Sequence, residues 1–269
     1  MKFRPRLYNC LAIVFLAGIQ LTPDSLVIAE TPHELKPLLA IPDKVVLEED
    51  FEKPAPLNKQ HWGARMGTQW TIVDGVLRGK PSTAEYQASK KDHQGFEPRV
   101  SSPITPAQFV AKFSVRFSGG SETAIVPFVE FGHHVARIQF SKEGTFLLAE
   151  HDSLKVAEAK EFKFEIDRWY HALAELKGEE FVIQFSNGPT LYAKHASYAA
   201  PAPSGGNGLG VAGPKGGTAE IDNVTLWTIL PNTQATWSAT RSRLPKFEPI
   251  LVKQIPSSGG KKAKAGKEE

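Results

Sequence analysis

Apolar and polar residues alternate along much of this chain. From residue 109 to 117 every second position is apolar, and Lys112, Ser114 and Arg116 stand between them. Residues 181–185 repeat the pattern, with Phe181 and Phe185 on the apolar side. A period of two is typical of β-strands with one face in a core, and a helix would need a period of 3.6.

Short turn sequences separate these alternating segments. Asp74-Gly75 lies between residues 69–73 and 76–79, which is the strongest short-range signal for a two-residue hairpin turn. Lys177-Gly178-Glu179 separates residues 168–176 from 181–185 in a similar way. Short strands with frequent turns and no long amphipathic helix predict one all-β domain, a two-sheet antiparallel sandwich.

The two ends of the chain differ from its middle. Lys2, Arg4 and Arg6 precede an apolar run, and small residues stand before Glu30, so residues 1–29 read as a secretory signal peptide cleaved near Ala29. The alternative is an uncleaved anchor. We expect a lead-in over 30–43, the sandwich over 44–230, a C-terminal extension over 231–256 and a disordered basic tail over 257–269.

Composition narrows the possible chemistry. The only cysteine, Cys10, falls within the signal peptide, so the mature protein would have no disulfide, thiolate nucleophile or cysteine metal site. The net charge of +3 is largely carried by the N-terminus and the tail. Without a basic stripe, nucleic acid is not an expected partner. The apolar run near the N-terminus is too short for a stable membrane span.

The glycine-rich segment 204–213 has a Gly-x-Gly spacing, but no β-α-β context surrounds it. A nucleotide-binding loop needs a helix N-terminus to hold phosphate. We therefore interpret this segment as a turn before a short strand. Two smaller expectations are a strand over 84–88 and a short helix within 233–243.

Several motifs follow one another in a familiar order. Asp50-Phe51 comes first, residues 70–77 and 168–171 follow, and Ile221-Asp222-Asn223-Val224 comes last. In this order the chain resembles the concanavalin A-like jelly-roll sandwiches, and most of all secreted bacterial domains of the 3-keto-disaccharide hydrolase type. The resemblance spans roughly residues 45–229 and implies a carbohydrate partner on the concave face of the larger sheet. It carries no compact catalytic signature over to this chain.

Candidate catalytic residues are carboxylates and histidines near strand ends. Glycoside hydrolysis generally uses a pair of carboxyl groups, and Glu130 and Glu150 are the candidates here, assisted by His133 or His134. The two adjacent histidines point to opposite sides of a strand, so they cannot both bind one metal ion without a bend.

Sugars present hydroxyl edges and apolar ring faces, so a binding surface needs planar polar groups and aromatic rings. The candidate substrate-binding residues stand on mixed faces or in loops: His93, Arg99, Arg116, Arg137, Gln139 and His171. Trp70 and Trp169 are aromatic candidates, although we favour a core position for both.

Oxygen-rich side chains on the first and last strands form a candidate metal site. Because the resemblance implies that these strands are neighbours, Asp50, Asp222 and Asn223 could hold a structural Ca²⁺ ion. Otherwise Asp222-Asn223 turns the backbone. No other cofactor is expected.

Three functions remain open at this point. The first is a secreted carbohydrate-binding protein without turnover. The second is a glycoside hydrolase of the 3-keto-disaccharide hydrolase type. The third is a structural or adhesive protein of the cell envelope.

Overall fold

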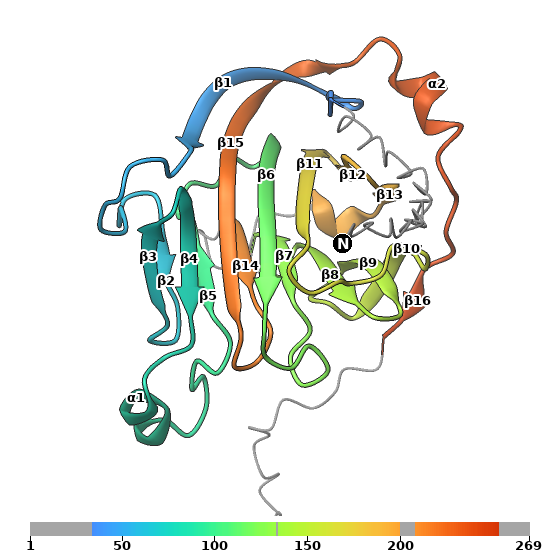
Figure 1. Ribbon diagram of the computed structural model, residues 1–269. Helices are drawn as coiled ribbons and strands as arrows, with labels where there is room; N and C mark the ends of the chain where they lie inside the picture. The colour runs from blue at the N-terminus through green and yellow to red at the C-terminus, as the bar shows by residue number, and fades with distance from the viewer. Residues whose placement is uncertain (1–33, 133, 200–207, 253–269) are drawn as a thin grey trace, which may run out of the picture. The chain divides into compact units, whose positions relative to one another are not determined.

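The computed structural model describes residues 34–132, 134–199 and 208–252, which belong to one unit spanning Pro32–Glu269. These residues form two antiparallel sheets packed face to face (Figure 1). The expected signal peptide, the basic tail and His133 lie outside the described residues. In the part that is described, no helix has the length and apolar character needed to cross a membrane.

The first sheet has the strand order β13-β12-β11-β6-β15-β4-β3, with β1 also paired to β15. Its strands are β1 (Ala40–Glu49), β3 (Gln69–Val73), β4 (Val76–Lys80), β6 (Phe109–Ser118), β11 (Trp169–Lys177), β12 (Glu180–Phe185), β13 (Thr190–Lys194) and β15 (Thr218–Thr233). One edge of β15 is shared, because its first residues pair with β4 and its later residues pair with β1.

The second sheet has the order β16-β10-β9-β8-β7-β14-β5-β2. Its strands are β2 (Gly63–Ala64), β5 (Arg99–Ser101), β7 (Phe128–Phe131), β8 (Ala136–Ser141), β9 (Gly144–Ala149), β10 (Leu154–Ala159), β14 (Leu209–Ala212) and β16 (Ile250–Leu251). Strands distant in sequence are neighbours in both sheets, as in a concanavalin A-like jelly roll. The predicted fold class is confirmed.

Aromatic residues fill the space between the sheets. The alternating rows point inward as expected: Phe113, Phe117 and Phe181 are almost completely buried. Phe117 packs against Phe140 of the opposite sheet with ring centroids 5.7 Å apart. Burying such rings is the main favourable contribution to folding in a domain without disulfides.

The hairpin turn at Asp74-Gly75 forms as predicted. Both residues have positive φ angles, 53° and 73°, and Val73 pairs with Val76. Residues 84–88 differ from expectation, because they belong to the short helix α1 (Ala84–Ser89) and not to a strand. The Thr83 side chain caps this helix by accepting a hydrogen bond from the Tyr86 amide.

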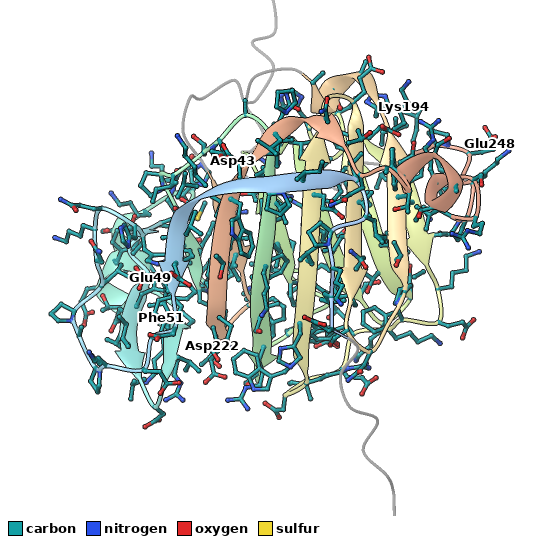
Figure 2. All side chains as sticks on the ribbon, turned by 90° about the horizontal axis from the view of Figure 1, so that it is seen from above. Asp43, Glu49, Phe51, Lys194, Asp222 and Glu248 are labelled. Atoms are coloured by element: carbon teal, nitrogen blue, oxygen red, sulfur yellow. The ribbon has the colours of Figure 1, made fainter. Side chains whose placement is uncertain are left out.

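A second, smaller apolar cluster covers part of the outer face of the first sheet. Leu39 and Ala40 pack there against Val110, Leu173 and Trp237. Trp237 belongs to α2 (Trp237–Arg241), the short helix expected in the C-terminal extension. β1 runs across this face in Figure 2. Both ends of the described chain therefore pack on the sandwich.

Glu175 lies beneath this cover. Although the alternation of β11 directs its side chain to the outer face of the sheet, Glu175 is completely buried. Its carboxylate accepts hydrogen bonds from the backbone amides of Leu38, Leu39 and Ala40, at 2.8, 2.9 and 2.7 Å. Burial raises the pKa of Glu175, although these three bonds act in the opposite direction. The residue anchors the N-terminal segment to the sheet.

Candidate functional site

Polar side chains gather on the outer face of the second sheet. Because Val129 and Ile138 point into the core, their neighbours Glu130 and Arg137 must point outward. Two rows of paired residues cross this face. One row is Arg99, Ala212, Phe128, Gln139 and Phe146; the other is Ser101, Gly210, Glu130, Arg137 and Leu148.

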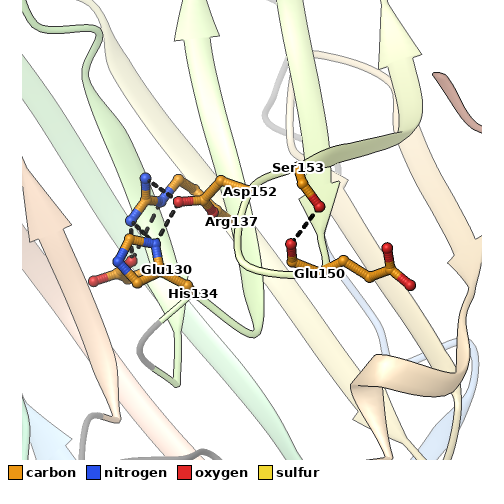
Figure 3. Close-up of polar contacts among 6 residues, drawn as sticks. All are labelled: Glu130, His134, Arg137, Glu150, Asp152 and Ser153. Carbon is orange, nitrogen blue, oxygen red and sulfur yellow. Dashed lines mark hydrogen bonds and ion pairs between the residues drawn. The ribbon is translucent and has the colours of Figure 1, made fainter. Parts of the chain in front are cut away.

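Arg137 is the centre of the cluster (Figure 3). Its Nη2 donates to Glu130 Oε2 at 2.6 Å, and its Nη1 lies 2.6 Å from Asp152 Oδ2. The three side chains are mostly buried, with exposed fractions of 8–15%. One guanidinium thus holds two carboxylates in fixed positions, a strong arrangement because its donors form a rigid fork.

His134 joins the same network through one ring nitrogen. Its Nδ1 contacts Asp152 Oδ2 and also lies 2.9 Å from Nη2 of Arg137. A proton on Nδ1 favours the carboxylate, while an unprotonated Nδ1 can accept from the guanidinium. The tautomer of His134 therefore decides whether Nδ1 donates to Asp152 or accepts from Arg137.

Phe128 is covered by two cations. The guanidinium carbons of Arg99 and Arg137 lie 5.0 and 3.9 Å from its ring centroid. Burial lowers the pKa of Arg99, and the charge of Glu130 partly offsets this. With both cations near its ring, Phe128 supports the arginines and offers little open surface for stacking with a sugar.

Small residues on β14 make room for the cluster. A Cβ atom added to Gly210 would lie 3.0 Å from Cγ of Glu130, so the Glu130 side chain occupies the space above this glycine. On the other side of β14, Gly210 pairs with Ser101 of β5, which is also largely buried. The absence of a side chain at Gly210 allows Glu130 to lie close to the sheet.

Two polar atoms of the cluster have no hydrogen-bond partner among the described residues. They are Nε of Arg99, which is a donor, and Oδ1 of Asp152, which is an acceptor. Both atoms are buried. Buried polar atoms are nearly always satisfied in folded proteins, and an exception calls for an explanation such as a bound water, an ion or a functional role.

The other predicted catalytic residue, Glu150, points away from this cluster in Figure 3. Its carboxylate lies 3.4 Å from Nε2 of His195 and is about half exposed. His195 in turn caps the short helix η1 (Ala196–Tyr198) through Ser197. Glu130 and Glu150 thus do not form a pair, and the second carboxylate beside Glu130 is Asp152.

Arg116 and His171 lie on the opposite side of the sandwich, on the outer face of the first sheet. Arg116 Nε donates to Glu220 at 2.5 Å and its guanidinium covers the Trp169 ring. His171 Nδ1 is 2.8 Å from Ser114 Oγ. Burial lowers the pKa of His171, and the charge of Asp222 partly offsets this effect.

The predicted substrate-binding residues therefore occupy two faces and cannot form one surface. Arg99, Arg137 and Gln139 share the face of Glu130. His93 is exposed in the loop after α1 and has a φ angle of 50°. Trp169, which we expected in the core, is partly exposed, whereas Trp70 is buried there.

The candidate calcium residues meet where β1 ends and β15 is irregular. Burial raises the pKa of Asp222, and the charges of Glu52 and Asp50 raise it further. Both Asp222 oxygens accept hydrogen bonds from Asn223, at 2.7 Å each, as expected for a residue pair that turns the backbone. Among the described residues no group of three or more His, Cys, Asp or Glu side chains could hold a metal ion. Calcium binding by Asp50, Asp222 and Asn223 therefore stays a prediction.

The sequence did not identify Asp152 or Phe128 as candidate site residues. Asp152 ends the run Glu150-His151-Asp152, in which all three residues have positive φ angles between 49° and 66°. Consecutive left-handed residues without glycine are unusual, but the sequence gives no sign of them. Phe128 appears only as one more apolar residue in a largely apolar segment.

Comparisons with known proteins extend only to the fold. No protein-family model matches the chain, and no curated protein matches its sequence. Among solved structures, the carbohydrate-binding module CBM66 from Bacillus subtilis is 14% identical and has a TM-score of 0.44; the alignment covers 64% of this chain and 98% of the module.

Two further structures have similar scores. A β-1,3-glucanase from Mycobacterium marinum is 12% identical with a TM-score of 0.42, over 69% of this chain and 99% of the glucanase. The exoplasmic/lumenal domain of VIP36, in a form bound to Ca²⁺ and Man3GlcNAc, is 9% identical with a TM-score of 0.42, over 64% and 87%. The chain has the concanavalin A-like jelly-roll architecture that its motifs predicted, and the finer resemblance to 3-keto-disaccharide hydrolases stays a prediction.

Proposed function

We propose that this protein is a secreted carbohydrate-binding protein that holds a glycan on the outer face of the second sheet. The binding residues are Arg99, Glu130, Arg137 and Asp152, with Gln139 beside them in the same rows of side chains. The proposal depends on the chemistry of this cluster, as follows.

The observation that carries the proposal is the pair of unsatisfied buried atoms. A sugar hydroxyl both donates and accepts hydrogen bonds, so glycan hydroxyls can accept from Arg99 Nε and donate to Asp152 Oδ1 once neighbouring side chains move to uncover these buried atoms. Leaving such atoms unpaired costs roughly 1–3 kcal/mol each, and a ligand that pairs them recovers that free energy.

The rest of the cluster is already fixed in place. Arg137 holds both Glu130 and Asp152, and the guanidiniums of Arg99 and Arg137 both lie over the Phe128 ring. A site whose side chains are ordered before binding avoids much of the entropic cost of ordering them. Because cations cover the Phe128 ring, we expect polar contacts and not aromatic stacking to dominate recognition.

One observation favours a second function, hydrolysis of a glycoside of the 3-keto-disaccharide type. Glu130, Asp152 and His134 lie together, and carboxyl groups with a histidine are suitable for acid-base catalysis. However, both carboxylates bind the same guanidinium. A general acid must present a proton to the leaving group, so Arg137 would have to release one of them first.

Binding to a panel of immobilised glycans, followed by calorimetry with the best ligand, tests the proposal. Glu130→Gln should weaken binding at least about tenfold, because hydrogen bonds to charged groups are worth roughly 1.5–3 kcal/mol. Glu220→Gln is the matched control: Glu220 is also buried and held by arginines, but on the opposite face.

If Glu220→Gln abolishes binding and Glu130→Gln does not, the glycan binds on the outer face of the first sheet and the proposed site is wrong. Failure of every glycan to bind would contradict the function itself. Incubation with oxidised and ordinary disaccharides separates the second candidate, because product that disappears in Glu130→Gln would identify an enzyme.

Secretion is part of the proposal. It is supported by the basic start and the apolar run of residues 1–29. N-terminal sequencing of the exported protein should find Glu30 or a residue close to it. A protein that keeps Met1 and stays inside the cell would contradict this assignment.

A further inference from the structure

A cleft lies between the C-terminal extension and the edges of the two sheets. Its volume is about 470 Å³, and residues from β10, β13, α2 and the segment 244–249 line it. Figure 2 shows Lys194 and Glu248 on either side of α2 at this end of the molecule. The cleft is separate from the Glu130 cluster, because none of its lining residues belongs to that cluster.

The charged side chains that line this cleft are cationic. They are Lys194, Arg241 and Lys246, which stand beside the hydroxyl-bearing Ser238 and Ser242, and among the described lining residues there is no carboxylate. Two of these cations have carboxylate partners next to the cleft, Lys194 with Glu179 and Arg241 with Glu180, whereas Lys246 has no ion-pair partner among the described residues. A concave surface lined by cations concentrates anions.

Glu180 fixes one wall of the cleft. Its carboxylate accepts from the Tyr192 hydroxyl at 2.8 Å, from Trp237 Nε1 at 3.2 Å and from Arg241 Nη1 at 3.0 Å. Burial and this carboxylate raise the pKa of Tyr192 to about 12, so its hydroxyl stays neutral. The extension is thus bound to the sheet edge before any ligand arrives.

Cationic donors remain available for a ligand. Arg241 has five N–H donors, and its interactions with Glu180 and Tyr192 do not use all of them. Lys246 forms no ion pair with any residue in the described ranges. The pair of Lys194 and Glu179 is 3.5 Å long and about half exposed, which makes it weak and easily exchanged.

We propose that this cleft binds a ring-sized molecule carrying one anionic group, a carboxylate, sulfate or phosphate. The anion lies between Arg241 and Lys246, and the ring packs against Tyr192 and Phe247. The cleft volume lies within the range of about 300–1,000 Å³ that small-molecule sites have. This site is independent of the glycan site proposed above.

Calorimetric titration of the full chain with four probes tests this inference. Glucuronate, glucose 6-sulfate and glucose 6-phosphate carry the three anionic groups on the same ring, and glucose is the neutral control. At least one anionic probe should bind, glucose should not, and the ranking identifies which anion is preferred.

Two variants with the same change of charge locate the binding. Lys246→Glu should weaken binding of the anionic probe about tenfold or more, since the new carboxylate repels it. Lys59→Glu changes an exposed lysine that is not among the lining residues and should leave the affinity unchanged. Thermal melting of both variants checks that they are folded, and Glu130→Gln should bind the anion normally.

The inference is overturned if no anionic probe binds at millimolar concentration, or if glucose binds as well as the anions. Equal losses in Lys246→Glu and Lys59→Glu would likewise overturn it, because they would show a general effect of net charge. Because the probes are sugars, binding that Glu130→Gln removes and Lys246→Glu leaves intact belongs to the glycan site and would also count against this cleft.

Discussion

Removing the carboxylate of Glu175 should detach the N-terminal segment from the sandwich. Three consecutive backbone amides, those of Leu38, Leu39 and Ala40, donate to this one completely buried side chain. In Glu175→Ala no acceptor remains for them under the apolar cover. In Glu175→Gln one oxygen remains, and the amide nitrogen must face an N–H donor.

The expected magnitudes follow from the number of bonds. Each orphaned buried donor costs roughly 1–3 kcal/mol, so three of them would cost at least about 3 kcal/mol in Glu175→Ala. Glu175→Gln should lose about 1–2 kcal/mol, because one donor is orphaned while a buried charge is removed. A change of 1 kcal/mol shifts Tm by roughly 2–4 °C in a domain of this size.

Urea and thermal unfolding measure these changes, and limited proteolysis reports whether residues 34–40 are released. Glu161→Gln, at an exposed position, is the control and should stay within about 0.5 kcal/mol of wild type. If Glu175→Ala matches wild type in stability and protease resistance, the anchoring role is wrong.

Because burial raises the pKa of Glu175, the contribution of this residue to folding stability is complete at low pH and declines as the pH rises through its folded-state pKa. The Glu175→Gln variant should lack this decline.

Three further predictions concern other parts of the sandwich. Gly79→Ala should destabilise the protein by about 1–3 kcal/mol, because its Cβ would lie 2.5 Å from two atoms of the buried Trp70 ring and closer still to a third; unchanged urea unfolding would contradict this close contact. Asp222→Asn should raise Tm, since burial and neighbouring carboxylates disfavour the charge; a lower Tm, combined with loss of a calcium-dependent rise seen in wild type, would identify a calcium site instead. Burial holds the pKa of His171 below 6.5. The stability that neutral His171 contributes is therefore present above pH 6.5 and is lost as the pH falls towards its folded-state pKa. His171→Gln should therefore lose less stability than wild type between pH 7.5 and 5.5, and equal losses would count against this assignment.

The alternation of apolar residues was enough to predict the strands and their inward faces. Phe113, Phe117 and Phe181 are in the core because a period of two leaves only one face for burial. The Asp74-Gly75 turn was predictable for a local reason, since both residues adopt positive φ angles readily. These features depend on short stretches of chain, which a single sequence displays directly.

Features formed by distant segments were not predictable in this way. The pattern of β11 places Glu175 on the outer face, but its hydrogen-bond donors are residues more than 130 positions away. Similarly, the strand pattern gives the outward direction of both Arg116 and Arg137 without showing that they lie on opposite sheets. Asp152 reaches Arg137 only because the loop after β9 bends back through left-handed residues.

The most direct test of the proposed function is where a bound glycan lies. Backbone amide NMR shifts should be followed while the best glycan from the binding panel is titrated into the full chain. We predict that the largest shifts fall on residues of β7, β8 and β14 around Glu130, Arg137 and Gly210, with little change around Arg116 and His171. Shifts confined to the outer face of the first sheet would contradict the proposed site, and no shifts with any glycan would contradict carbohydrate binding.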